Sequence, residues 1–425
     1  MYRTLELQPG VVLRYIQATR FKQGCLTMQF LRPMNSQEAG INALIPAILL
    51  RGCREYPDLK RITERLDDLY GASVGTLVRR IGDYQTTGFY CGFIEDRFAM
   101  GGDEILRPMV ELAAQLLLEP ICEEGGFSRD FTESEKRNLI SAIESERSNK
   151  GAYAASKLLK LMCQRDSFGV GRLGEISAIQ EIDHVSAWAH YQKVLAESPV
   201  ELFYVGSAPM ETVASLLKPV FQRIERKFVP LPAQTGYHYS PGATQTEVQQ
   251  VAQAHLSMGF VTPITNQDER FAAMQVCNNL FGGGMTSKLF MQVREKMSLC
   301  YAIGSGYYGS KGILTVNAGI DANQEEAVKE AVVHQLAACK NGEISESELA
   351  AAKESLLSGL RAVYDSPGAM EGFFSTAAIS GLNRTPQVYS AQIRAVTARD
   401  VARAAATLQH HSTFFLKGGD HGQTV

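Results

Sequence analysis

Residues 132–147, TESEKRNLISAIESER, and residues 345–364, SESELAAAKESLLSGLRAVY, are two versions of one helical pattern. The second version begins 213 residues after the first, and each opens with Ser or Thr and acidic side chains. Such residues favour a helix N-terminus, because they cap exposed N–H groups and complement the helix dipole. We therefore predict that a long helix begins at Thr132 and again at Ser345, inside a unit that occurs twice.

The segments around these two helices repeat as well. An apolar-periodic helix precedes each one, EILRPMVELAAQLL at 104–117 and EEAVKEAVVHQLAAC at 325–339. Each half closes on a helix and then a short apolar strand, which ends at Gly206 or Gly418. Four further runs have the alternation or β-rich content of strands: CLTMQFLRP at 25–33, YQTTGFYCGF at 84–93, AQAHLSMGF at 252–260 and GILTVNAGI at 312–320.

Residues 227–245, rich in proline and small polar side chains, have the composition of a linker between the halves. We predict an N-terminal half over 1–226 and a C-terminal half over 246–425. Strands and helices are mixed without strict βαβ alternation, so we expect an α+β fold. Each half would be a sheet covered by helices, and two homologous halves would make a bilobed molecule.

The composition is that of a globular protein with a full core: 425 residues, 45% hydrophobic and 20% charged. A net charge of −3 and a pI of about 6.3 do not favour a nucleic-acid or membrane-surface partner. We expect no signal peptide and no membrane span, and we predict a cytoplasmic protein. The eight scattered cysteines are then expected to be buried free thiols: Cys25, Cys53, Cys91, Cys122, Cys163, Cys277, Cys300 and Cys339.

The placement of histidine restricts the chemistry most. All eight histidines lie at position 184 or later: His184, His190, His238, His255, His334, His410, His411 and His421. A helical zinc site needs two histidines on one face, and neither HExxH nor HxxEH occurs. His184 and His190 would lie on opposite sides of a helix, and we place His410 and His411 in a loop. FGGGMTSK is not a phosphate loop, and no GxSxG motif occurs.

The stretch 278–301, NNLFGGGMTSKLFMQVREKMSLCY, resembles the second-half signature of the pitrilysin/insulinase family of zinc peptidases, which includes mitochondrial processing peptidase. The matching features are a glycine-rich turn, a small polar pair, Arg-Glu and Leu-x-Tyr: Gly282, Gly283, Gly284, Thr286, Ser287, Arg294, Glu295, Leu299 and Tyr301. The duplicated halves suit the same family, so the resemblance covers nearly the whole chain. It implies that Arg294 and Tyr301 grip a peptide backbone and stabilise an oxyanion, for which guanidinium and phenol donors are suited.

The first half resembles the family around its zinc motif but lacks the ligands. INALIPAILLRGCREYP, residues 41–57, matches the segment that carries HxxEH in active members. The resemblance places the two histidines, the general base and the third ligand at Ala43, Ala47, Pro46 and Ala142. Glu135 matches a supporting carboxylate of the family. A methyl group has no lone pair and proline cannot accept a proton, so we expect this chain to bind no zinc and no other cofactor.

The resemblance implies that zinc peptidases of this type can be divided between two chains, one with HxxEH and one with the Arg/Tyr pair. We interpret this chain as the second kind, a non-catalytic subunit that binds peptide and supplies Arg294 and Tyr301 to the zinc centre of an HxxEH-bearing partner. A peptide-binding or structural scaffold without hydrolytic function stays open, as does an independent enzyme of unrelated chemistry. A homodimer is also compatible with the sequence.

Overall fold

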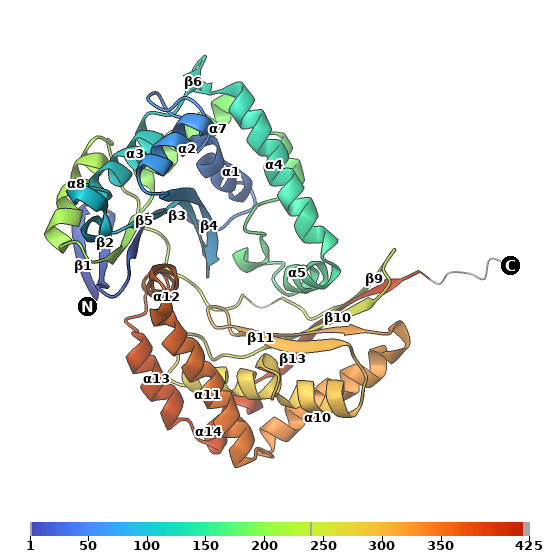
Figure 1. The fold of residues 1–425 in the computed structure, drawn as a ribbon. Coiled ribbons are helices and arrows are strands. Elements are labelled where there is room, and N and C mark those ends of the chain that lie inside the picture. The colour runs from blue at the N-terminus through green and yellow to red at the C-terminus, as the bar shows by residue number, and fades with distance from the viewer. Residues whose placement is uncertain (1, 239, 420–425) are drawn as a thin grey trace. The chain divides into compact units, whose positions relative to one another are not determined.

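The computed structural model describes residues 2–238 and 240–419 as two compact units (Figure 1). The first unit contains Met1–Ile143, Val170–Gln234 and Tyr364–Ile379, and the second contains Glu144–Gly169, Thr235–Val363 and Ser380–Val425. Each unit combines one large sheet with helices, which confirms the predicted α+β class. Among the described helices, none has the length and apolar character needed to cross a membrane.

The first unit is built on a six-stranded sheet in the order β1-β2-β8-β3-β5-β4. Neighbouring strands are antiparallel except β2 and β8, which run parallel. The strands are β1 (Tyr2–Gln8), β2 (Val11–Gln17), β3 (Gln23–Pro33), β4 (Ser73–Ile81), β5 (Tyr84–Ile94) and β8 (Val200–Gly206), with a small hairpin of β6 (Cys122–Glu123) and β7 (Gly126–Phe127) outside the sheet.

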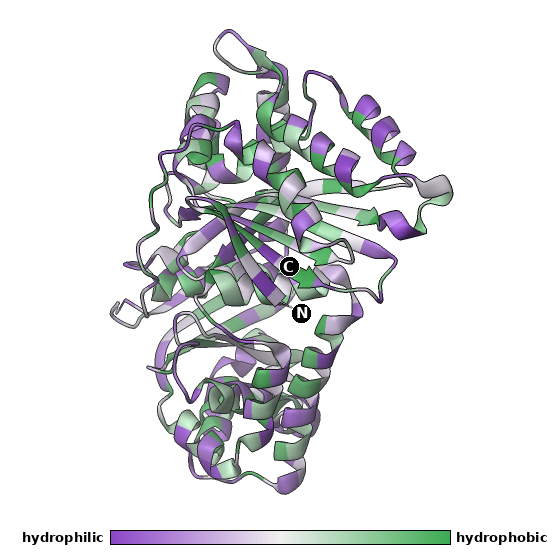
Figure 2. Ribbon diagram, turned by 90° about the vertical axis from the view of Figure 1, so that its left-hand side faces the viewer, coloured by the Kyte–Doolittle hydropathy of each residue, from purple (hydrophilic) through white to green (hydrophobic). Residues whose placement is uncertain are grey.

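The main core of this unit lies between the sheet and a layer of amphipathic helices. In Figure 2 the ribbons of these helices carry both hydrophobic and hydrophilic residues. Leu26, Met28 and Phe30 of β3 face this core, and α1 contributes Leu44 and Ile48. The helices are α1 (Ala39–Leu49), α2 (Leu59–Asp68), α3 (Leu106–Leu118), α4 (Arg129–Ser148), α6 (Ile176–Gln180), α7 (His184–Glu197) and α8 (Met210–Gln222), with short 3₁₀ turns η1 (Asp96–Phe98) and η2 (Met100–Gly102).

The opposite face of β3 is polar and is covered by α12 (Pro367–Ile379), a helix from late in the chain. Glu371 of α12 is fully buried, and its carboxylate accepts two hydrogen bonds from Arg79, at 3.0 and 2.9 Å. Gln29 Nε2 donates to the same carboxylate at 2.8 Å, and Thr27 Oγ1 donates at 3.3 Å. Because each donor comes from the sheet, this network fixes where α12 lies.

The second unit is built on a five-stranded sheet in the order β11-β12-β10-β13-β9. Again one pair, β9 and β13, is parallel and the others are antiparallel. The strands are β9 (Thr244–Gln249), β10 (Ala254–Val261), β11 (Ala302–Tyr308), β12 (Ile313–Ile320) and β13 (Gln409–Gly418).

The helices of the second unit include two π-helical segments, η4 and η5. The set is α5 (Lys150–Met162), η3 (Ser167–Gly169), α9 (Phe271–Asn278), η4 (Asn279–Gly283), η5 (Leu289–Lys296), η6 (Ala322–Gln324), α10 (Glu325–Lys340), α11 (Glu346–Ala362), η7 (Val363–Asp365), α13 (Pro386–Ala395) and α14 (Ala398–Ala406). α5 comes from the first half of the chain, and its Leu158 and Met162 pack with Phe414 and Leu416 of β13.

The two sheets confirm the predicted duplication. The order β2-β8-β3-β5-β4 in the first unit corresponds, strand for strand and direction for direction, to β9-β13-β10-β12-β11 in the second. β1 has no counterpart. Each half also gives one helix to the sheet of the other, α5 to the second unit and α12 to the first, which the sequence did not indicate.

Several local predictions need correction. α4 begins at Arg129 rather than at Thr132, whereas Ser345 does cap α11 by accepting from the N–H of Glu348. His410 and His411 belong to β13 and not to a loop. Cys122 is exposed, although the other seven cysteines are buried and all eight are free thiols. β9 begins at Thr244, inside the stretch predicted as a linker; the division at 1–226, 227–245 and 246–425 itself stays a prediction.

We predict that Arg79→Met destabilises the first unit by about 3 kcal/mol, because it leaves the buried Glu371 carboxylate without its cation. Urea unfolding followed by the fluorescence of Trp188, the only tryptophan, measures this unit directly. Arg61→Met is the matched control, since Arg61 pairs with Glu64 at an exposed position and its loss should change stability by less than about 0.5 kcal/mol. If the two substitutions lower the free energy of unfolding equally, the buried ion pair of Arg79 with Glu371 does not stabilise the first unit as predicted.

Candidate functional site

The residues at the zinc-motif positions lie in the first unit, on α1 and α4. Ala43 and Pro46 are buried on α1, and Ala43 belongs to the hydrophobic core, whereas Ala47 is half-buried and Ala142 is exposed on α4. Pro46 lies inside α1 and has no N–H to donate to the carbonyl of Asn42. None of these side chains carries an atom that could bind a cation or accept a proton, so the positions do not fit a zinc ion.

Glu135, predicted as a supporting carboxylate, is buried and paired. Its Oε1 lies 3.4 Å from Nη1 of Arg51, and its Oε2 accepts from Asn138 at 3.1 Å. The second unit has the equivalent pair, Lys288 and Glu348 at 2.7 Å, and Glu348 lies 213 residues after Glu135. In the first unit the ion pair joins the segment just after α1 to α4, and the supporting role of Glu135 itself stays a prediction.

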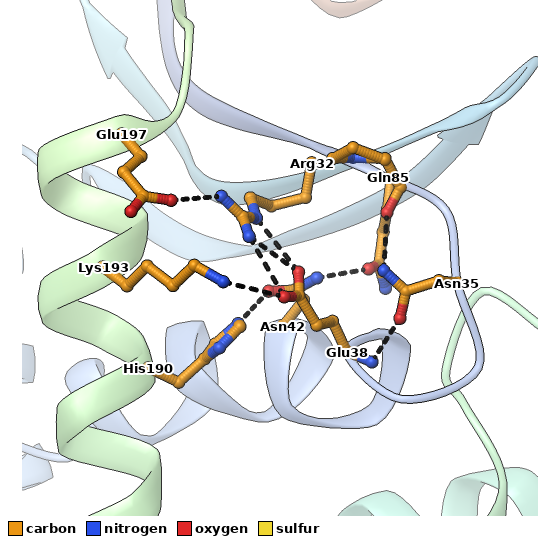
Figure 3. Close-up of polar contacts among 9 residues, drawn as sticks. Arg32, Asn35, Glu38, Asn42, Gln85, His190, Lys193 and Glu197 are labelled. Atoms are coloured by element: carbon orange, nitrogen blue, oxygen red, sulfur yellow. Dashed lines mark hydrogen bonds and ion pairs between the residues drawn. The ribbon is translucent and has the colours of Figure 1, made fainter. Parts of the chain in front are cut away.

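A network of polar side chains links α7, α1 and β5 (Figure 3). Gln85 Nε2 donates to the carbonyls of Ala39 and Arg172, so its oxygen accepts from Asn42 Nδ2 at 2.9 Å. Asn42 Oδ1 must then accept from His190 Nε2, 2.7 Å away, which places the imidazole proton on Nε2. Burial lowers the pKa of His190 to about 4, so the ring is neutral near pH 7.

An ionic cluster continues this network at the N-terminus of α1. Arg32 donates to both oxygens of Glu38 and to Glu197, and Lys193 lies 3.3 Å from Glu38 (Figure 3). Burial opposes ionisation of Glu38, but the hydrogen bonds from Arg32 outweigh it and lower the pKa of Glu38. The two positive charges, of Arg32 and Lys193, neutralise the two carboxylates, so the cluster connects α1 to its neighbours without leaving an unpaired charge.

The glycine-rich turn of the second unit is shaped by close packing. A Cβ on Gly282 would lie 2.7 Å from both Leu289 Cδ1 and Ser305 Oγ, so only glycine fits against β11 there. Gly283 closes η4, and Gly284 is extended. Ser305 Oγ donates to Asn278 Oδ1 at 2.8 Å, which attaches the turn to the sheet.

Arg294 and Tyr301 are brought together through the backbone. Arg294 lies in η5, which ends at Lys296, and Tyr301 immediately precedes β11, so the two do not share one helix face. Arg294 Nε donates to the carbonyl of Tyr301 at 3.0 Å, and Nη1 donates to Glu295 at 2.9 Å. The guanidinium carbon also lies 4.6 Å from the ring centroid of Phe290.

The phenol of Tyr301 is 62% exposed and has a partner that the sequence analysis missed. Its O–H donates to Asp321 Oδ1 at 3.0 Å, and this hydrogen bond raises the pKa of Tyr301. The register of the β11–β12 hairpin, which pairs Ala302 with Gly319, could have indicated this contact by counting outward from the turn. The exposed phenol and guanidinium can therefore donate to a peptide, provided that a ligand displaces the internal acceptors.

Elsewhere in the described part of the chain, no three His, Cys, Asp or Glu side chains are grouped in a way that could hold a metal ion. His184 and His190 both lie on α7, but His184 approaches Arg129 whereas His190 contacts Asn42.

Comparison with known proteins gives a consistent result. Residues 183–356 match the family described as the peptidase M16 inactive domain. The chain is 28% identical over 412 residues to "Probable inactive metalloprotease YmfF" of Bacillus subtilis, covering 96% of each chain. A conserved protein from Enterococcus faecalis is similar in structure, with a TM-score of 0.89 and 27% identity over 99% of this chain and 100% of that one. A peptidase M16 inactive domain from Pseudomonas fluorescens has the same fold, with a TM-score of 0.82, 19% identity and 100% of each chain covered.

We predict that the purified chain carries no stoichiometric zinc, because alanine occupies all three positions on α1 and α4 that the resemblance assigns to zinc ligands. Elemental analysis of the protein, purified without chelator, measures this directly. A full equivalent of zinc that disappears when residues of α1 are substituted would contradict the prediction.

We also predict that His190 makes stability depend on pH between about 6.5 and 4, the ordinary and folded pKa values. Below pH 6.5 the unfolded chain takes up a proton that the folded chain does not, so the free energy of unfolding falls as pH falls and levels off below about 4. Glu38 contributes separately, below its ordinary pKa of 4.5.

The measurement is urea unfolding at several pH values, followed by the fluorescence of Trp188, which lies two residues before His190 on α7. His190→Gln removes the titrating group, so the variant should lose part of the slope within this pH window and be unchanged in slope above it. Parallel curves for the two proteins would show that His190 is not responsible.

Proposed function

Since the chain belongs to the pitrilysin/insulinase (M16) family of peptidases, we propose that it is the non-catalytic subunit of a two-chain zinc peptidase. One observation carries this proposal: the second unit presents two adjacent hydrogen-bond donors, the exposed Tyr301 and the half-buried Arg294, whereas the positions assigned to the zinc motif on α1 and α4 hold no ligand.

In this proposal the partner is a homologous subunit that carries HxxEH and binds the zinc ion. The zinc would activate water and polarise the peptide carbonyl in that subunit. Arg294 would donate to the peptide backbone from Nη1 and Nη2, because its Nε already holds the carbonyl of Tyr301. Tyr301 would donate its phenolic proton to the oxyanion as charge develops on it.

The internal partners of these donors are compatible with such a role. Asp321 and Glu295 are exposed carboxylates, so exchanging their hydrogen bonds for bonds to a peptide occurs in contact with water and changes the free energy little. The carbonyl of Tyr301, in contrast, stays bound to Arg294 and keeps the two residues adjacent. The backbone of Tyr301 is held further by its N–H, which donates to Gly319 at 2.9 Å.

A second candidate function is a peptide-binding or structural scaffold without hydrolytic activity. The observation that favours it is that Tyr301 and Arg294 already have internal acceptors, Asp321, Glu295 and the Tyr301 carbonyl. In a scaffold these contacts would be permanent and would only stabilise the end of η5. Kinetics of a reconstituted pair distinguishes the two functions.

Placement in the cytoplasm stays part of the proposal.

We predict that Tyr301→Phe, measured in the complex with the HxxEH-bearing subunit, lowers peptide turnover by about 10²–10³-fold, because one oxyanion donor is lost. Folding and subunit association should be unchanged, since only a hydroxyl is removed from an exposed side chain. Arg294→Ala should raise KM in addition, because it deletes a charge and several donors.

Tyr70→Phe is the matched control for this experiment. Tyr70 also donates an exposed phenolic O–H to a carboxylate, Asp103 at 2.7 Å, but it lies far along the sequence from the donor pair. Turnover should therefore be unaffected by this substitution. If Tyr301→Phe and Arg294→Ala both leave turnover unchanged in an intact complex, the scaffold function is the correct one.

A further inference from the structure

The duplication leaves one strand position of the second sheet open. In the first unit β1 pairs antiparallel with the outer edge of β2. β9 is the counterpart of β2, because each runs parallel to the closing strand of its half, β13 or β8. Within residues 2–238 and 240–419, no strand pairs with the outer edge of β9. Its outward N–H and C=O groups are thus a template for another strand.

Apart from the charged side chain of Glu247, β9 lacks the features with which edge strands usually prevent pairing. Its sequence, TQTEVQ, contains no proline and no lysine, and the strand shows no bulge against β13. Val248 is 58% exposed on this edge strand. A branched apolar side chain on an open edge gains burial when a further strand is added beside it.

The strand is also held rigidly, which favours binding. Ala243, just before β9, exchanges hydrogen bonds with β13: its carbonyl accepts from Thr413 N–H at 2.9 Å, and its N–H donates to Ser412 Oγ at 3.1 Å. From α5, Tyr153 Oη donates to Glu247 at 2.8 Å. A template that is already ordered loses little conformational entropy when it binds an extended segment.

The charges around β9 favour an acidic partner. Glu247 is the only carboxylate of the strand, and it lies 3.3 Å from Lys157. Lys150, also on α5, donates to the neutral amide oxygen of Gln249 at 2.7 Å. Lys417 of β13 lies beside Val248 in the register. Three lysines therefore adjoin a strand that carries one carboxylate.

We propose that the outer edge of β9 binds an extended acidic segment of another polypeptide by β-strand addition. The added strand runs antiparallel to β9, as β1 runs to β2, and its main chain bonds to the open edge. Its acidic side chains point toward Lys150 and Lys157, and its apolar side chains pack against Val248. This surface is separate in sequence and in the sheet from β11, which Arg294 and Tyr301 adjoin, so the inference does not depend on the proposed peptidase role.

The probe is a fluorescein-labelled octapeptide in which Glu alternates with Val, and its binding to the full chain is measured by fluorescence polarisation. We expect the same peptide with Lys in place of Glu to bind at least about tenfold more weakly, because charge complementarity is lost. Two further peptides carry N-methyl groups on alternate amides, one on the odd-numbered and one on the even-numbered residues. Only one of the two should lose binding, since only one set of N–H groups faces β9.

Two variants at one position locate the site. Val248→Asp should weaken binding of the Glu peptide by about 3–10-fold, because it removes the apolar contact and adds a like charge, whereas Val248→Lys removes the same contact without adding a like charge and should weaken binding less. Val388→Asp, at a valine on α13 that is 51% exposed, is the matched control and should have no effect. Hydrogen exchange read by mass spectrometry should show new protection over residues 244–249.

Three outcomes would overturn the proposal. Protection elsewhere than 244–249, or equal binding of both N-methylated peptides, would show that no strand is added to β9. Equal effects of Val248→Asp and Val248→Lys would show that the lysines do not select the partner. A dimer in light scattering that Val248→Asp dissociates would assign the edge to a second copy of this chain instead.

Discussion

The carboxylate of Glu371 is fully buried, and the arrangement of the first unit depends on it. An ionised carboxylate can be buried only where cations and donors replace water, and Arg79, Gln29 and Thr27 supply them from the sheet. Glu371 lies on α12 (Pro367–Ile379), whereas the last strand of the sheet along the chain, β8, ends at Gly206. The first unit is therefore complete only when late parts of the chain have been made, and α5 gives the second unit the same dependence on the first half. Each of the two units therefore contains segments from both halves of the chain.

Helix α1, on which the resemblance places the zinc motif, is held by packing and by polar contacts within this chain. Of the positions that the resemblance assigns to zinc ligands, Ala43 packs in the hydrophobic core, whereas Ala47 is half-buried and Ala142 is exposed. α1 is held by Asn42, His190 and Gln85 and by the ionic cluster around Arg32. None of these contacts involves a metal. In the second unit, close packing at Gly282 and the hydrogen bond from Arg294 to the carbonyl of Tyr301 hold the segment that bears both donors.

The sequence was sufficient to predict the α+β class, the duplication and most strands, because these follow from local periodicity and a repeated spacing. It could not indicate the exchange of α5 and α12, since an amphipathic helix shows that it has an apolar face but not which sheet covers it. The start of α4 was misplaced because Thr132 follows a helix-compatible Arg129, and capping chemistry alone did not distinguish them. His410 and His411 were misassigned because polar residues at the beginning of β13 interrupt its apolar pattern. Asp321 was missed because its contact with Tyr301 depends on hairpin register.

The central claim is that this chain completes the active site of a zinc-bearing homologue. The most direct measurement is peptide hydrolysis by three samples at equal concentrations: this chain, an HxxEH-bearing homologue and a stoichiometric mixture of the two. The account predicts that the mixture hydrolyses peptide far faster than the sum of the separate chains, and that the zinc remains with the homologue. Activity of the homologue that is the same with and without this chain, although the two associate, would contradict the claim.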